Sequence, residues 1–247
     1  VSSETTTDES LNNLLSQVRT LLPQDNGNWS VYVCNLMKGT EGTIDNQPMQ
    51  AASLIKLYIM GAVYENYDQI TGQYGRDSVD SNLYSMITVS DNDAANTLTT
   101  YLGGGDSAAG MQAVNSFCQA HGYDQTHMGR MLLASNENDD NYTSVGDCGH
   151  LLQEIYKQDT SGYTHATDMF NLLKAQTRCN KIPAQLPEGV KTANKTGELD
   201  NVENDAGIIY DSKNDVVIVF MSQNLSSAGS AQNTIATLSR TIYDYYN

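Results

Sequence analysis

The sequence predicts a single α+β fold with two lobes: an antiparallel sheet flanked by helices from both ends of the chain, and an inserted, mostly helical lobe. Two observations predict it. Extended, β-rich segments occur near the start and the end of the chain, whereas the apolar residues between 51 and 186 have helical or irregular spacing. The length of 247 residues, 39% of them hydrophobic, fits one domain with a sizeable core. We expect the active site in the cleft between the two lobes.

The chain begins with a polar stretch of low complexity, residues 1–10, which is typical of a flexible tail. We interpret it as a linker exposed by processing, which places the protein outside the cytoplasm, either secreted or tethered to the cell envelope. A single domain then covers residues 11–247. Its α/β lobe comprises residues 11–50 and 187–247, and its helical lobe comprises residues 51–186.

The first half of the α/β lobe is predicted to be a helix followed by a hairpin. The helix stops at Pro23, and its apolar residues recur three and four positions apart: Leu11, Leu14, Leu15, Val18, Leu21 and Leu22. The β-rich run Trp29–Met37 and the shorter extended run Thr43–Asn46 are separated by a glycine-containing turn. They are therefore predicted to pair as antiparallel strands.

The second half of the α/β lobe returns to strands and ends in a helix. Strands are predicted over Val190–Thr196, Ala206–Tyr210 and Val216–Met221. The final helix carries one apolar stripe, formed by Ile235, Leu238, Ile242 and Tyr245. In the helical lobe, the polar segment Ser135–Asn141 is predicted to be a loop.

The charge balance excludes several classes of partner. Thirteen lysines and arginines stand against 29 aspartates and glutamates, which gives a formal net charge of -16. Without a basic cluster, the sequence lacks the positive surface that nucleic acids or anionic membranes require. No apolar run approaches the roughly 18 residues of a membrane-spanning helix. We expect a small-molecule substrate, no nucleic-acid partner, no membrane insertion within this chain, and a monomer.

The cysteines and histidines do not form a metal-binding pattern. Cys34, Cys118, Cys148 and Cys179 lack the spacing of a zinc site, and the four histidines are scattered, so no metal or other cofactor is predicted. Four cysteines permit three complete disulfide pairings, and buried free thiols are the alternative. Cys34 lies in an apolar strand-like run and is the cysteine most expected to be free.

Ser53 and Lys56 lie three positions apart at the start of an apolar helical run, so they share one helix face. A serine hydroxyl is a good nucleophile when a base removes its proton, and a lysine is such a base when burial or a nearby cation lowers its pKa. At a helix N-terminus, the backbone N–H of Ser53 would also face an oxyanion formed on attack. An S-x-x-K pattern alone arises by chance about once in a chain of this size.

Two further motifs follow in order: Ser90-Asp91-Asn92, and then Lys195-Thr196-Gly197 in a strand-like run. S-x-x-K, S-D-N and K-T-G are the three motifs of the penicillin-recognising serine enzymes. The segment 87–96 resembles the class A β-lactamase segment around the second motif, and 192–198 resembles the strand that bears the third. From about residue 11 onward, the chain therefore resembles a class A β-lactamase-like serine hydrolase. This resemblance implies the β-lactamase/transpeptidase-like fold.

The resemblance implies a catalytic role for residues of the first two motifs. Ser53 would be the acylated nucleophile and Lys56 its base or proton shuttle. Ser90 would carry the proton toward the leaving nitrogen, and Asn92 would hold Lys56 and the acyl-amide side chain of the substrate. Asp91 is instead expected to order its loop through backbone hydrogen bonds.

The third motif is implied to bind the substrate. Lys195 and Thr196 would attract and orient the substrate carboxylate. Lys195 is also counted among the catalytic residues, with Ser53, Lys56 and Ser90. Gly197 would leave the strand free of a side chain where substrate lies against the backbone. The backbone N–H of Glu198 would complete the oxyanion hole with that of Ser53.

The resemblance fails on the loop that follows the second motif. Class A β-lactamases carry a glutamate there, in an E-x-x-L-N pattern, which activates the water that hydrolyses the acyl-enzyme. The corresponding residues 129–144 lack this pattern. Arg130 is expected to pair with Asp139 or Asp140 and so close the loop. Glu137 is the only glutamate in it, and its very polar surroundings favour a solvated carboxylate over a deacylating role.

Three functions therefore stay open. The preferred one is a class A-like serine hydrolase in which Ser53 attacks a β-lactam or a related amide or ester, with slow deacylation. A D-Ala-D-Ala carboxypeptidase or related esterase uses the same motifs and needs no loop glutamate. A non-catalytic sensor domain that binds β-lactams or cell-wall peptides would give either no adduct or a stable one, and the intact motif set argues against the version without acylation.

Overall fold

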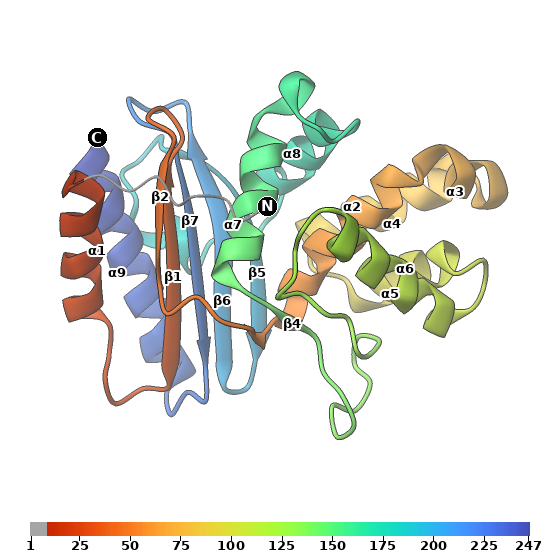
Figure 1. Cartoon of the computed structure of the whole chain (residues 1–247), viewed down its shortest axis with the longest axis horizontal. Coiled ribbons are helices and arrows are strands. Elements are labelled where there is room, and N and C mark those ends of the chain that lie inside the picture. Colours follow the sequence, from red (N-terminus) through yellow and green to blue (C-terminus); the bar gives the residue numbers. More distant parts are fainter. Residues whose placement is uncertain (1–8) are drawn as a thin grey trace.

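The computed structural model describes residues 9–247, and the predicted tail lies outside the described residues except for Glu9 and Ser10, which open the first helix. At its centre is a five-stranded antiparallel sheet with the strand order β2-β1-β7-β6-β5 (Figure 1). The strands are β1 (Asn28–Asn35), β2 (Thr40–Ile44), β5 (Lys191–Leu199), β6 (Val202–Tyr210) and β7 (Val216–Gln223). Strands from both ends of the chain thus form one sheet, as the sequence predicts.

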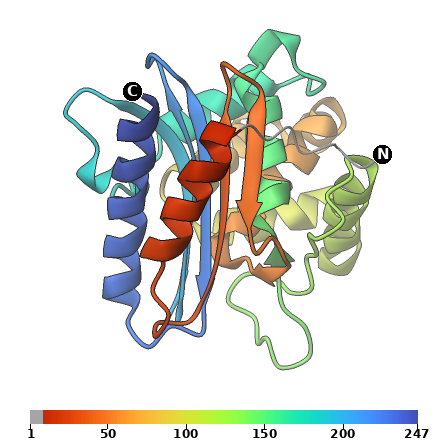
Figure 2. The ribbon, with the colours of Figure 1, turned by 60° about the vertical axis from the view of Figure 1, so that its left-hand side comes forward.

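The two terminal helices cover one face of this sheet. Helices α1 (Glu9–Leu21) and α9 (Ala228–Tyr246) lie side by side there (Figures 1 and 2). Their apolar stripes share a core with alternate sheet residues, among them Leu14, Val18, Ile235, Ile218 and Phe220. The predicted stripe of α9 was wrong at its last position: Tyr245 is 40% exposed and Tyr246 is buried, because Tyr246 is four positions after Ile242.

The other face of the sheet is covered by the inserted helical segment. Helices α7 (Val145–Tyr156) and α8 (Ala166–Lys174) lie nearest the sheet (Figure 1). Beyond them are α2 (Ile55–Glu65), α3 (Tyr67–Tyr74), α4 (Arg76–Thr88), α5 (Asn92–Leu102) and α6 (Ser107–Ala120). The remaining short elements are the strand pair β3 (Met49–Gln50) and β4 (Tyr142–Thr143) and the 3₁₀ helices η1 (Ala52–Leu54), η2 (Gln158–Thr160) and η3 (Ile182–Gln185). Of these, η1 packs against β5, and η3 packs against α9. Every residue of α2 from Ile55 to Tyr64 is buried, so this helix is the axis of the helical lobe.

Strands β5 and β6 are longer than predicted at the end where they meet. The predicted strands stop at Thr196 and start at Ala206, but the ladder continues through the pair Leu199 and Val202. The added β6 residues Glu203, Asn204 and Asp205 are polar, and all three are buried. These polar residues can occupy a buried strand because other buried groups form hydrogen bonds or ion pairs with their side chains. The hydrophobicity pattern of the sequence does not reveal such partners.

Two further sequence questions are answered by the fold. All four cysteines are free: Cys34, Cys118 and Cys148 are buried, and Cys179 is exposed. The prediction that Cys34 is free is confirmed. Among residues 9–247, no helix combines the length and the apolar character that a membrane span requires.

Candidate active site

Ser53 lies in the 3₁₀ turn η1, between the short strand β3 and the buried helix α2. The preceding residue, Ala52, has a left-handed backbone with φ of 48°, an uncommon conformation for a residue other than glycine. Asn204 holds the turn by donating from Nδ2 to the carbonyl oxygen of Ala51 at 3.1 Å. The Ser53 side chain is half-buried and lines two adjoining cavities.

Lys56 is fully buried, and its ammonium nitrogen connects the first two motifs. Nζ lies 3.0 Å from Ser53 Oγ, 2.9 Å from Ser90 Oγ, 2.7 Å from the Ser90 carbonyl oxygen and 2.8 Å from Asn92 Oδ1. Burial lowers the pKa of Lys56 to about 8, and the positive charge of Arg178 contributes in the same direction. The lysine therefore has a substantial neutral fraction near neutral pH.

The second motif is positioned by the connection between α4 and α5. Ser90 has a left-handed φ of 58°, and Asp91 caps α5 by accepting from the backbone N–H of Ala94 at 2.8 Å. The structural role expected for Asp91 is confirmed by this cap. Because Asn92 begins the helix immediately after the cap, its side chain is fixed beside Lys56.

Lys195 reaches the same point from strand β5. Its Nζ donates to Ser90 Oγ at 2.9 Å and to the carbonyl oxygen of Thr196 at 2.7 Å. Burial and the nearby charge of Lys56 lower the pKa of Lys195 well below its usual value. Ser90 Oγ thus lies between two lysine nitrogens.

Gly197 packs closely against the turn that carries Ser53. A Cβ on Gly197 would lie 2.9 Å from the Ala51 carbonyl oxygen and 3.1 Å from the backbone nitrogen of Ser53. The glycine therefore allows β5 to pack against the backbone of the nucleophile turn itself. This close approach brings the strand segment that includes Glu198 next to the Ser53 N–H, as an oxyanion hole would require.

Two cavities open at Ser53. One, of about 160 Å³, is lined by Ser53, Ser90, Asn92, Arg178, Thr196 and Glu198. The other, of about 340 Å³, shares Ser53, Asn92 and Glu198 and extends along the loop residues 132–136. Five of the eight predicted site residues line these cavities. The other three lie close by: Lys56 and Lys195 contact Ser90 from behind, and Gly197 lies against Ser53.

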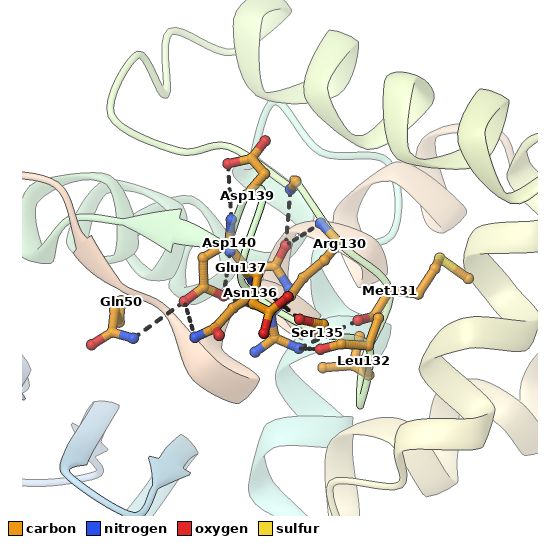
Figure 3. Close-up of polar contacts among 12 residues, drawn as sticks. Gln50, Arg130, Met131, Leu132, Ser135, Asn136, Glu137, Asp139 and Asp140 are labelled. Carbon is orange, nitrogen blue, oxygen red and sulfur yellow. Dashed lines mark hydrogen bonds and ion pairs between the residues drawn. The ribbon is translucent and has the colours of Figure 1, made fainter.

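The loop that follows the second motif is closed by a buried ion pair (Figure 3). Arg130 Nε donates to Asp140 Oδ1 at 2.7 Å, and the two side chains are only 11% and 6% exposed. Gln50 and Asn136 also donate to this carboxylate, at 3.2 and 3.5 Å. Burial raises the pKa of Asp140, but the hydrogen bonds outweigh burial and hold the pKa below its usual value. The expected pairing of Arg130 is confirmed, with Asp140 as the partner.

The same loop presents no carboxylate of its own to Ser53. Leu132 is held at the cavity wall by Asn96, whose amide donates to the Leu132 carbonyl at 3.0 Å and accepts from the Leu132 N–H at 2.9 Å. Glu137 is exposed and does not line either cavity, as its polar surroundings predict. Asn96 and Leu132 were missed by sequence reasoning because neither belongs to a motif.

Behind β5 lies a buried charged cluster that the sequence did not reveal. Lys181, fully buried, pairs with Glu203 at 2.8 Å and with Glu198 at 2.9 Å. Asp205 accepts from Asn194 Nδ2 and from the Ile182 N–H, both at 2.9 Å, and burial raises the pKa of Asp205 to about 6. The cluster connects β5 to β6 and to the segment around Lys181. Arg178 was also missed, since an exposed arginine between motifs carries no local signal.

In the described part of the chain, no group of three or more His, Cys, Asp or Glu side chains is arranged to hold a metal ion.

The comparisons with known proteins agree with this fold. The chain matches the model of the beta-lactamase enzyme family over residues 13–79 and 75–246. Its structure is similar to that of PBP-A, with a TM-score of 0.82 and 23% identity over 95% of this chain and 96% of that one. No curated protein matches the chain.

Two β-lactamase structures show the same likeness. An ancestral class A β-lactamase superposes with a TM-score of 0.80 at 20% identity, over 94% of this chain and 99% of that chain. A β-lactamase from Sphaerobacter thermophilus gives a TM-score of 0.78 at 20% identity, over 94% and 96%. The fold is thus that of the β-lactamase-like serine hydrolases. The chain belongs to the beta-lactamase enzyme family, and the resemblance and the fold class predicted from sequence are both confirmed.

Proposed function

We propose that this protein is a serine acyl-hydrolase in which Ser53 attacks the carbonyl of a β-lactam or a related amide or ester, and in which deacylation is slow. One observation carries the proposal: Lys56 Nζ lies within hydrogen-bonding distance of both Ser53 Oγ and Ser90 Oγ, at 3.0 and 2.9 Å. A single base thus connects the nucleophile to the hydroxyl that serves the leaving group.

Acylation proceeds as one proton circuit. Neutral Lys56 removes the proton of Ser53 as Oγ forms its bond to the substrate carbonyl carbon, and the carbonyl oxygen becomes an oxyanion. The backbone N–H groups of Ser53 and Glu198 stabilise that charge. The proton then passes from Lys56 through Ser90 to the substrate nitrogen as the C–N bond breaks. This leaves the ester on Ser53 and a neutral Lys56.

The positively charged side of the smaller cavity orients the substrate. Thr196 and Arg178 line it, and Lys195 lies behind Ser90. A substrate carboxylate placed there meets these donors, and Arg178 offers a planar fork that matches a carboxylate. In a protein with a net charge of -16, this local positive charge is what permits an anionic substrate to bind.

Slow deacylation follows from what faces the acyl group. Hydrolysis of the ester needs a base beside the attacking water. The loop contributes Leu132 and Asn136 to the larger cavity, and neither can accept a proton from water. Glu198 lines this cavity, but Lys181 lies 2.9 Å from it and lowers its pKa, which weakens it as a base.

The β-lactam class is supported by the family and by one relative. A mutant of PBP-A forms an acyl-enzyme complex with penicillin G, and PBP-A has the same fold as this chain. A D-Ala-D-Ala carboxypeptidase or esterase is the second candidate, and it is favoured by the absence of a loop carboxylate at Ser53. We further propose that the protein acts as a monomer and is located outside the cytoplasm.

Intact-protein mass spectrometry with penicillin G tests the proposal. The wild type is expected to gain one penicillin mass, and Ser53→Ala to gain none. Ser226→Ala is a matched control, because Ser226 lies in the loop before α9 and lines neither cavity, and it should be acylated like the wild type. An unmodified wild type contradicts acylation. Release of D-Ala from a D-Ala-D-Ala peptide without penicillin turnover would select the second candidate.

A further inference from the structure

A separate cavity, of about 500 Å³, lies in the helical lobe and shares no lining residue with the two cavities at Ser53. It is formed where the end of α2 meets α3, α4 and α8. Four rings and two carboxylates dominate its wall: Tyr64, Tyr67, Tyr84, His165, Asp80 and Asp168. The proposed acyl-hydrolase chemistry uses none of them.

The rings form a connected aromatic wall. Tyr64 is buried and stacks on Tyr67 and on His165, with ring centroids 5.7 and 5.0 Å apart, and Tyr67 and His165 are 4.9 Å apart. Tyr67 and His165 are half-buried and Tyr84 is 55% exposed, so these three keep surface toward the cavity. Aromatic faces carry partial negative charge and attract weakly hydrated cations.

A cation already uses one of these faces. The guanidinium carbon of Arg76 lies 5.9 Å from the centroid of the Tyr67 ring. This distance is within the range of a cation–π contact. The Tyr67 ring therefore lies where it can contact a positive group.

Two carboxylates add negative charge to the wall, and one of them pairs with His165. Asp80 accepts from the Tyr67 hydroxyl at 2.7 Å, and Asp168 lies 2.9 Å from His165 Nδ1. Within residues 9–247, no lysine or arginine forms an ion pair with either carboxylate. Burial raises the pKa of Tyr64, and the charges of Asp168 and Asp80 raise it further.

We propose that this cavity binds an organic ammonium group. Two aspartates outweigh the single guanidinium of Arg76, so the site is negative, and the net charge of -16 disfavours an anion. A hard metal ion would need several oxygen ligands at one point, and no such group occurs in the described part of the chain. Rings and carboxylates together match an alkylated ammonium, which is weakly hydrated and positive.

The test is an NMR titration of ¹⁵N-labelled protein with choline and with 3,3-dimethylbutan-1-ol, its neutral isostere. Choline is expected to shift amide signals of α3, α4 and α8, and the neutral isostere to bind at least about tenfold more weakly. Asp80→Asn and Tyr67→Leu are each expected to weaken choline binding about fivefold or more.

Two matched controls separate the site from general effects. Asp77→Asn removes an exposed carboxylate from the same helix, and Tyr101→Leu removes one ring of the stacked pair Tyr74 and Tyr101, which lines no part of this cavity. Both should bind choline like the wild type. Equal binding of choline and its neutral isostere, shifts outside α3, α4 and α8, or no shift at about 50 mM choline would overturn the proposal. Because the readout is local and needs no acylation, its failure is independent of the function proposed for Ser53.

Discussion

The cluster around Ser53 and the loop of residues 129–144 lie against one another, yet they are built differently. In the cluster, one lysine nitrogen has four oxygen acceptors within 3.0 Å, and a second lysine shares one of them. The loop is also well fixed, by the Arg130–Asp140 pair and by Asn96, but it directs Leu132 and Asn136 toward Ser53. The difference shows that the loop is firmly held without directing a carboxylate of its own at Ser53. Under the proposed function, the cluster forms the acyl-enzyme, and the loop does not accelerate its hydrolysis.

The largest expected effect comes from removing the base of the cluster. Lys56→Ala should lower the rate of acylation by about 10³-fold, because the proton of Ser53 then has no acceptor within reach. Mass spectrometry with a penicillin, sampled over time, measures this rate. Lys157→Ala, which changes an exposed lysine paired with Glu154, should acylate at the wild-type rate. Wild-type acylation by Lys56→Ala would show that another group is the base.

The second prediction adds to the loop a carboxylate that faces Ser53. Leu132→Glu places a carboxylate at the wall of the cavity that also contains Ser53, on a backbone already fixed by Asn96. Deacylation should accelerate by about 10²-fold, within the range of a well-placed general base. The decay of the penicillin adduct measures this. Glu137→Gln should leave the decay unchanged, since Glu137 lies outside both cavities, and a slower decay in that variant would identify Glu137 as the base.

The sequence predicted the residues of the Ser53 cluster better than the contacts that hold the loop, and the difference has a physical reason. Ser53, Lys56, Ser90 and Lys195 were found because their chemistry requires fixed residue types at short spacings. The residues that hold the loop and strand β5 were not predicted, because Asn96 and Asp205 act through contacts between distant segments. Strand β6 shows the same limit: Asp205 looked like a loop residue, and it is buried only because Asn194 and the Ile182 backbone meet it.

The third prediction concerns pH and applies to the cluster alone. Burial lowers the pKa of Lys56 to about 8, and the base is active when neutral. The acylation rate should therefore rise about tenfold per pH unit below pH 8 and level off above it. Stopped-flow mixing with a chromogenic β-lactam measures the profile. A rate that does not change between pH 6 and 9 would argue against neutral Lys56 as the base.

The smallest expected effect is on stability. Arg130→Ala leaves Asp140 buried without its cation and should reduce the free energy of unfolding by about 3 kcal/mol. Denaturant unfolding measures the loss. Arg240→Ala breaks an exposed pair with Asp244 and should cost less than about 0.5 kcal/mol. Equal losses would show that the Arg130–Asp140 pair does not hold the loop.

The contrast between acylation and deacylation is tested most directly by a pre-steady-state time course with a chromogenic β-lactam in excess. The account predicts a rapid burst of one product per protein, followed by a much slower steady rate, and the loss of both phases in Ser53→Ala. Fast linear turnover without a burst, or without accumulation of an adduct, would contradict it, because the protein would then possess an efficient base for deacylation.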